Sequence, residues 1–418
     1  MENNNERPKC IYFNETPKNK KIDLIVNGQG VFVFDVAHNH NNNNKRESAY
    51  FILHNKIGHN ELMIEFNVGS VKMEKIEKYE KLIDPNNTQG LSDKKGAYYW
   101  FSIDYQNQLI QAGIGETRVE TVIYKYKFSH DDKAFLRDIH TIELLSNNIS
   151  PLKLLRDPIT YKIPLKVHDI HELTMSDIDN SRFMPKSFLT NVSKKMYDCI
   201  AGRKFILDDP SFPEFSKAIQ YSIQTPGCWC NKTLQKKSRE FNKDKPNLLE
   251  TYLRITLGQN NGESPGIPYV MEIWPIGHYS PVHSHSNANA VIRVLHGAIN
   301  VKLFPFLCYD VDGVKEFGES QFKKNDITWI SAELNQIHQL KNLETNKEPC
   351  ITIQCYMYDN EDDAHYDYFD YIDANGNKQQ YEPDSDMDFT NFKEMIKGEW
   401  KNRPRCNIFS SILGRKEK

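Results

Sequence analysis

The chain has 418 residues, with 53 Lys or Arg, 56 Asp or Glu and 39% hydrophobic residues, so global disorder is excluded and a packed core is available. This length is too great for one ordinary domain and suits two or three. A formal net charge of -3 gives no global field for a phosphate backbone, so we expect no nucleic acid partner. The sequence shows no secretory signal, no stretch as long as a membrane span and no spaced Cys framework. We therefore expect a cytoplasmic protein with reduced thiols and no membrane partner.

The first half of the chain has the pattern of a β-protein. Four runs rich in β-branched and aromatic residues are separated by Gly, Asn and Asp, and they are Val31–Val36, Leu62–Val68, Tyr98–Ile103 and Thr121–Phe128. Polar residues come before these runs, and shorter strand-like pieces with Pro and Asp come after them. We therefore expect a disordered tail over 1–20 and an accessory β-sandwich domain over 21–175.

The second half begins with a helical pattern and then returns to strands. Apolar residues over 189–223 recur at helical spacing, and Asp208-Asp-Pro210 divides the run into two helices. Short strands and turns rich in Gly, Asn and Asp follow, and the end of the chain is first acidic and then basic. We expect a second, mainly β domain with a short helical lead-in over 187–366 and a charged C-terminal tail over 367–418.

Three histidines in this second half form a candidate metal site. His283 and His285 are two residues apart, which places both imidazoles on the same face of a strand. Gly297 begins a turn, and His338 comes later on another strand. Neutral imidazole suits a divalent first-row metal, and three ligands on one face leave positions open for substrate and dioxygen. The alternative is three unrelated polar residues on a barrel.

The spacing around these histidines resembles the two motifs of the cupin superfamily. The first motif, Gly-x5-His-x-His-x3,4-Glu-x6-Gly, matches from Gly277 to Gly297, except that Ala290 stands in place of the Glu. The second motif ends in His-x3-Asn, which His338 and Asn342 match, although its usual Pro-x-Gly turn is missing. The resemblance implies a double-stranded β-helix, or jelly-roll barrel, for the second domain.

Three histidines without a carboxylate resemble the iron site of the cysteine dioxygenase family, and further matches extend over roughly 187–366. Tyr252-Leu-Arg254 is similar to the family's Tyr-x-Arg, whose Arg binds the substrate carboxylate. The other matching positions are Trp274, Tyr356 at the family's active-site tyrosine, and His365 close to a further family histidine. Gln354 replaces the family's relay histidine, and it can orient a tyrosine hydroxyl but cannot titrate near neutral pH. Ala290 replaces the Cys that vertebrate members crosslink to the tyrosine, so no thioether is expected.

The resemblance implies an Fe(II)-dependent thiol dioxygenase. Fe(II) would be held by His283, His285 and His338, and a small thiol amino acid would react with O2. L-cysteine is the first candidate substrate, with cysteine sulfinic acid as product, and cysteamine and 3-mercaptopropionate are alternatives. Arg254 would bind the substrate carboxylate, and Tyr356 would donate a hydrogen bond near the bound substrate and oxygen. The other residues of the substrate site would be Trp274, Gln354 and His365.

The residues by themselves also allow other interpretations. The alternative function is a non-catalytic cupin that binds a metal or ligand, with the sandwich serving interaction. Arg254 in a surface ion pair and Tyr356 as a wall residue of the core are structural alternatives, because such residues are common on strands. The sequence leaves the oligomeric state open.

The first domain has a weaker resemblance of its own. Tyr99–Ile103 followed by Leu109–Glu116 is similar to two strands of the β-sandwich domain named after farnesoic acid O-methyltransferase. This resemblance implies a binding or interaction module. We expect no methyl transfer, because no Gly-rich loop followed by a helix is found in the sequence.

Overall fold

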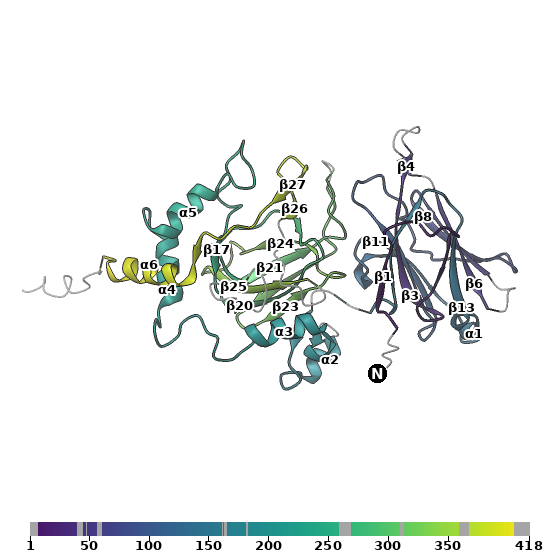
Figure 1. Ribbon diagram of the computed structural model, residues 1–418, viewed down its shortest axis with the longest axis horizontal. Coiled ribbons are helices and arrows are strands. Elements are labelled where there is room, and N and C mark those ends of the chain that lie inside the picture. Colours follow the sequence, from purple (N-terminus) through teal and green to yellow (C-terminus); the bar gives the residue numbers. More distant parts are fainter. Residues whose placement is uncertain are drawn as a thin grey trace, which may run out of the picture.

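The computed structural model describes residues 7–39, 45–46, 48–56, 61–160, 162, 165–180, 183–258, 269–309, 313–358 and 368–404. These residues form two β-rich units that lie side by side, the first in purple and blue and the second in green and yellow (Figure 1). The expected fold class, a β-sandwich followed by a cupin barrel with a helical lead-in, is confirmed. No helix in the described part of the chain has both the length and the apolar character needed to cross a membrane.

The first unit is a sandwich of two six-stranded antiparallel sheets. One sheet contains, in spatial order, β1 (Cys10–Tyr12), β14 (Ile149–Leu155), β3 (Gln29–Val36), β10 (Tyr99–Asp104), β11 (Leu109–Ile114) and β12 (Val122–Lys127). The other contains β2 (Lys21–Asp23), β13 (Ile139–Leu144), β6 (Ala49–Asn55), β7 (Glu61–Asn67), β8 (Ser70–Lys75) and β9 (Glu80–Leu82). Smaller elements join them, namely β4 (His38–Asn39), β5 (Lys45–Arg46), the 3₁₀ helix η1 (Val119–Thr121) and α1 (Lys133–Arg137).

Alternation of apolar and polar residues builds the core between the two sheets. Strands β6 and β7 bury every second residue, which turns one face of their sheet inward. The Phe34 ring lies between the sheets, with its centroid 4.6 Å from that of Phe51 and 5.1 Å from that of Phe66. Strand β1 lies within 1–20, where disorder was expected, because its backbone pairs with the open edge of β14 and needs few apolar side chains.

The second unit is a barrel of two further six-stranded sheets. One contains, in spatial order, β23 (Ile327–Ile330), β20 (Asn289–His296), β25 (Cys350–Met357), β18 (Tyr269–Trp274), β17 (Leu253–Thr256) and β28 (Met387–Asp388). The other contains β22 (Gly318–Lys323), β21 (Ala298–Leu303), β24 (Ile337–Lys341), β19 (His283–Ser284), β26 (Phe369–Ile372) and β27 (Lys378–Tyr381). Between the two units lie β15 (Lys166–His168), α2 (Met175–Asn180), β16 (Phe183–Pro185) and the 3₁₀ helix η2 (Lys186–Phe188).

Helices cover the outer face of one barrel sheet. They are α3 (Asn191–Ile200), α4 (Phe215–Gln224), α5 (Trp229–Lys237) and α6 (Phe389–Lys401), and Figure 1 shows α4, α5 and α6 at the end of the barrel away from the sandwich. Residues 351, 353, 355 and 357 of β25 pack in the same apolar cluster as these helices. Because side chains of a strand alternate, Thr352, Gln354 and Tyr356 face the barrel interior instead.

The segment expected to be a charged tail, 367–418, contributes three strands and a helix to the barrel. Strand β26 pairs with β19, and β28 pairs with β17. The segment is acidic, yet Phe369 and Tyr371 lie on either side of Asp370 on β26 and are buried, as is Tyr381 on β27.

The two units share one apolar core at their junction. The segment that follows β21 leaves the barrel and buries Phe306 and Cys308 within the apolar cluster of the sandwich. The backbone of Gly115 lies so close to Pro305 that a Cβ on that glycine would meet the Pro305 carbonyl oxygen at 2.0 Å. The Glu116 amide donates to the same carbonyl at 2.6 Å. The sandwich is therefore docked on the barrel through backbone and apolar contacts.

We predict that Phe306→Ala lowers the free energy of unfolding by about 3–5 kcal/mol, because it leaves a cavity in the shared core. Chemical denaturation of the full chain measures this loss. The control, Tyr79→Ala, removes a side chain that is 81% exposed and should change stability by roughly 0.5 kcal/mol or less. Equal stability of the two variants would contradict a shared core.

Candidate metal centre

Three buried imidazoles converge inside the barrel. His283 on β19 is the cross-strand partner of His338 on β24, and His285 follows two residues after His283. The Nε2 atom of His285 lies 3.1 Å from that of His283 and 3.2 Å from that of His338. The candidate ligand atoms of all three lie within 4.8 Å of one another. The structure thus brings together the three residues that the sequence predicted as a metal site.

The second nitrogen of two rings determines the tautomer. His283 Nδ1 lies 3.0 Å from the Pro281 carbonyl oxygen, and His338 Nδ1 lies 2.8 Å from that of Asn335. A carbonyl oxygen can only accept, so each neutral ring carries its proton on Nδ1 and its lone pair on Nε2. The Nε2 atoms of these two rings therefore present their lone pairs to His285 Nε2, which can donate to one of them or, with its proton on Nδ1, offer a third lone pair to a cation. This donor set therefore fits a divalent metal ion with three imidazole ligands.

Burial keeps these imidazoles neutral. Desolvation lowers the pKa of His283 to about 3 and that of His338 to about 4, and it also lowers the pKa of His285. A metal binds the neutral ring, so none of the three needs to lose a proton near neutral pH before it can bind.

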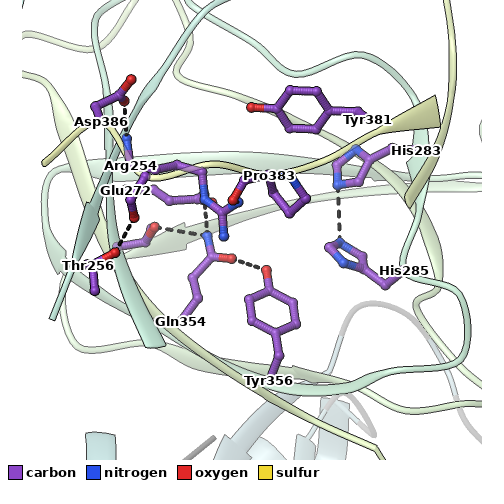
Figure 2. Close-up of polar contacts among 12 residues, drawn as sticks. Arg254, Thr256, Glu272, His283, His285, Gln354, Tyr356, Tyr381, Pro383 and Asp386 are labelled. Carbon is purple, nitrogen blue, oxygen red and sulfur yellow. Dashed lines mark hydrogen bonds and ion pairs between the residues drawn. The ribbon is translucent and has the colours of Figure 1, made fainter. Parts of the chain in front are cut away.

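The opposite wall of the cavity carries a connected row of polar side chains. Arg254 on β17 and Glu272 on β18 are cross-strand partners, with Nε 3.4 Å from Oε1. The amide of Gln354 on β25 donates to Glu272 Oε2 at 2.5 Å, and the Tyr356 hydroxyl donates to Gln354 Oε1. Figure 2 shows this row running from Arg254 to Tyr356 beside His283 and His285. Burial raises the pKa of Glu272 to about 7, while the Arg254 guanidinium favours the charged form.

The segment that follows β27 accepts two hydrogen bonds from Arg254. The Arg254 guanidinium donates from Nη1 to the Pro383 carbonyl oxygen at 2.6 Å, and its backbone amide donates to Asp386 Oδ2 at 2.8 Å. The arginine is 2% exposed. It does form an ion pair, as one sequence-based alternative proposed, but this pair is buried and faces the cavity.

Aromatic side chains form the rest of the wall. Tyr356 stacks on His285 with ring centroids 5.3 Å apart, and Trp274 stacks on Tyr252 with centroids 4.2 Å apart. Ala290 is the cross-strand partner of Tyr356, so its methyl group occupies the place beside the tyrosine. A cavity of about 20 Å³ lies beside the triad.

One cavity is lined by most of the site residues predicted from the sequence, namely Arg254, Trp274, His283, His285, His338, Gln354 and Tyr356. His365 lies outside the described residues. Sequence reasoning missed Glu272, which lines the same cavity. A single Glu in the otherwise apolar strand Tyr269–Trp274 was the signal that could have revealed it, since an unpaired buried carboxylate is costly.

Comparison with known proteins finds partial sequence similarity. No protein-family model matches the chain. Cysteine dioxygenase type 1 of Danio rerio is 24% identical over 106 residues, which are 25% of this chain and 50% of that protein. The Homo sapiens protein of the same name is 23% identical over 105 residues, with the same coverage. The chain thus spans about half the length of the curated relatives it matches.

Similar solved structures include a cupin-domain protein and a sugar isomerase. One is a cupin 2 domain-containing protein from Halorhodospira halophila, with 14% identity, coverage of 37% of this chain and 83% of that chain, and a TM-score of 0.19. Another is L-ribose isomerase from Geodermatophilus obscurus, with 9% identity, coverage of 26% and 59%, and a TM-score of 0.19. These scores are low, so the assignment of the barrel rests on its own strand order and motifs.

We predict that the metal-free protein loses stability as the pH falls below about 6.5, the pKa of an ordinary histidine. Below this pH the histidines of the unfolded chain become protonated. In the folded protein, His283 and His338 stay neutral until the pH reaches their lowered pKa values of about 3 and about 4. At pH 5 this difference is about 2 kcal/mol for each ring. Denaturation at pH 5 and pH 7.5 measures it.

The variant His283→Gln/His338→Gln should show a shallower dependence of stability on pH. The control, His130→Gln/His171→Gln, removes two exposed rings and should keep the slope of the original protein. The same slope in all three proteins would contradict the burial of neutral imidazoles.

Proposed function

Because three histidines converge inside a cupin barrel, we propose that this protein is an Fe(II)-dependent thiol dioxygenase. Its reaction would convert a small thiol and O2 into the corresponding sulfinic acid. The observation that carries the proposal is the set of three Nε2 donors facing a polar wall. In the part of the chain that the structure describes, the group of possible metal ligands consists of three histidines and no carboxylate. The partial similarity to cysteine dioxygenase type 1 adds support.

The overall reaction is balanced without an outside reductant. The sulfur of the thiol is oxidised, dioxygen is reduced by the same electrons, and both oxygen atoms end on sulfur while the proton stays with the sulfinic acid. Iron(II) bound by the three histidines would supply the redox chemistry between thiol and dioxygen. The protein would supply the position of the substrate and the exclusion of water from a closed cavity.

The residues of the opposite wall would orient the substrate. The Tyr356 hydroxyl lies against Gln354, so it can exchange this hydrogen bond for one to a bound substrate. Gln354 cannot take up a proton near neutral pH, so its role is to hold the tyrosine. If the substrate carries a carboxylate, as L-cysteine does in the resemblance, Arg254 is the cation that would meet it, although Glu272 already pairs with this arginine. Cysteamine and 3-mercaptopropionate are the alternatives.

A non-catalytic cupin is the second candidate class. Such a protein would bind a metal or ligand in the barrel and would consume no oxygen. The partial similarity to cysteine dioxygenase type 1 favours the catalytic candidate.

We predict that anaerobically purified protein loaded with Fe(II) consumes oxygen with at least one of the three thiols and releases the sulfinic acid. An oxygen electrode and mass spectrometry of the product measure both. His338→Ala should lose metal binding and activity together, since only two ligands remain. The control, His278→Asn, changes a buried histidine that bonds to Thr251 and is not one of the three ligands. Iron-loaded protein that consumes no oxygen with any thiol would rule out the proposed enzyme.

A further inference from the structure

Glu272 bears on which thiol the site accepts, and this inference rests on the proposed thiol dioxygenase function. We infer that Glu272 is a specificity-determining residue that pairs with Arg254 and selects a small thiol without a carboxylate, such as an aminothiol. The buried ion pair between Arg254 and Glu272 carries this inference.

The protein itself supplies a carboxylate to the arginine. Glu272 contacts Nε of Arg254 at 3.4 Å, and the Pro383 carbonyl oxygen accepts from Nη1. Glu272 is held in place by Gln354, and its side chain lines the same cavity as the triad. The positive charge that would bind a substrate carboxylate is therefore already balanced.

A second carboxylate would meet this one at close range. Above the pKa of Glu272, which is about 7, its carboxylate is charged, and two like charges a few ångströms apart repel strongly in a buried site, where the effective dielectric constant is far below that of water. The substrate would also lose its hydration without gaining a free cation. A thiol that lacks a carboxylate avoids both costs, and the amine of an aminothiol is attracted to Glu272.

We predict that the original protein binds cysteamine more tightly than L-cysteine or 3-mercaptopropionate. Glu272→Gln keeps the shape and removes the charge, so binding of both carboxylate thiols should tighten by about tenfold or more while cysteamine does not gain. Anaerobic calorimetry with Zn(II)-loaded protein measures binding without turnover, and KM values for the Fe(II) protein give a second readout. The double variant Glu272→Gln/Arg254→Met should lose the gain.

Glu348→Gln is the matched control, because it removes one carboxylate that pairs with His296 outside the cavity. Tighter binding of L-cysteine than of cysteamine by the original protein would overturn the inference. So would unchanged affinities of Glu272→Gln for L-cysteine and 3-mercaptopropionate. Neither result would affect the proposed enzyme, which fails only if no thiol is oxidised.

A different observation concerns the sandwich, which contacts the barrel loop just before the candidate metal ligand His338. We propose that the sandwich positions His338 through the buried pair Glu116–Arg118. The Arg118 Nε atom lies 2.9 Å from Glu116 Oε2, and both side chains are almost fully buried. Burying two charges is costly unless further hydrogen bonds satisfy both groups. The partners in those hydrogen bonds are the residues that the pair can position.

These remaining hydrogen bonds go to the barrel loop just before His338. Arg118 Nη2 donates to the Asn335 side-chain oxygen at 2.5 Å, and Glu116 Oε1 accepts from the Gln336 amide at 3.0 Å. The backbone carbonyl of Asn335 in turn accepts from His338 Nδ1. One chain of contacts therefore runs from the sandwich to the ring of a metal ligand.

The other neighbour of His338 is also tied to the sandwich. Its cross-strand partner is Leu303, and the chain continues from there into the segment that buries Phe306 in the sandwich core. The loop before His338 and the segment after its partner strand β21 therefore both contact the first domain. Glu116 and Arg118 are positioning residues, since they act through Gln336 and Asn335 and would not bind the metal themselves.

We predict that Glu116→Gln/Arg118→Met weakens Co(II) binding at the triad by about tenfold and shifts the visible spectrum of the bound Co(II). Gln at position 116 keeps an acceptor for Gln336, and loss of both charges leaves neither one unpaired. Anaerobic titration of the full chain, followed by absorption, measures affinity and ligand geometry together.

Asn335→Gly tests the same link from the barrel side. It removes the side chain that Arg118 contacts but keeps the carbonyl that accepts from His338, and glycine suits the φ of 65° at this residue. Lys75→Met/Asp132→Asn is the control, because it removes another ion pair of the sandwich far from the loop in sequence. An unchanged Co(II) spectrum and affinity in the first two variants, or an equal loss in the control, would overturn the proposal.

Discussion

The rest of the site depends on the convergence of three buried imidazole rings inside the barrel. The cross-strand pairing of His283 with His338 places two rings side by side, and the carbonyls of Pro281 and Asn335 turn both Nε2 atoms inward. His285 Nε2 lies 3.1 Å from His283 Nε2 and 3.2 Å from His338 Nε2, so all three nitrogens can face one cation when the proton of His285 is on Nδ1. The orientation of the rings thus has the form of a three-histidine metal site.

Two buried ion pairs lie near the triad, one on the opposite wall and one behind His338. On the opposite wall, Arg254 is already paired with Glu272, which changes the charge that a substrate would meet. Behind His338, the buried pair Glu116–Arg118 connects the loop to the sandwich. In our proposals, substrate choice depends on the first of these ion pairs and the geometry of the metal ligand on the second.

The sequence predicted the parts of the site that depend on local spacing. Two histidines at i and i+2 share a strand face, and His338 could be placed from its motif. Glu272 was missed because its contact with Arg254 depends on the register of β17 against β18, which local spacing does not reveal. The same reason explains the strands of residues 369–388 and the insertion of Phe306 into the sandwich, since both are contacts between distant segments.

The most direct test of this account is anomalous diffraction from crystals of the full chain grown with Fe(II) under anaerobic conditions. The account predicts one strong peak inside the barrel, at about 2 Å from the Nε2 atoms of His283, His285 and His338. The Glu272 carboxylate should remain on Arg254 and away from the metal. Bound iron at another position, iron held by Glu272, or crystals grown with Fe(II) in which the triad binds no iron would contradict the account.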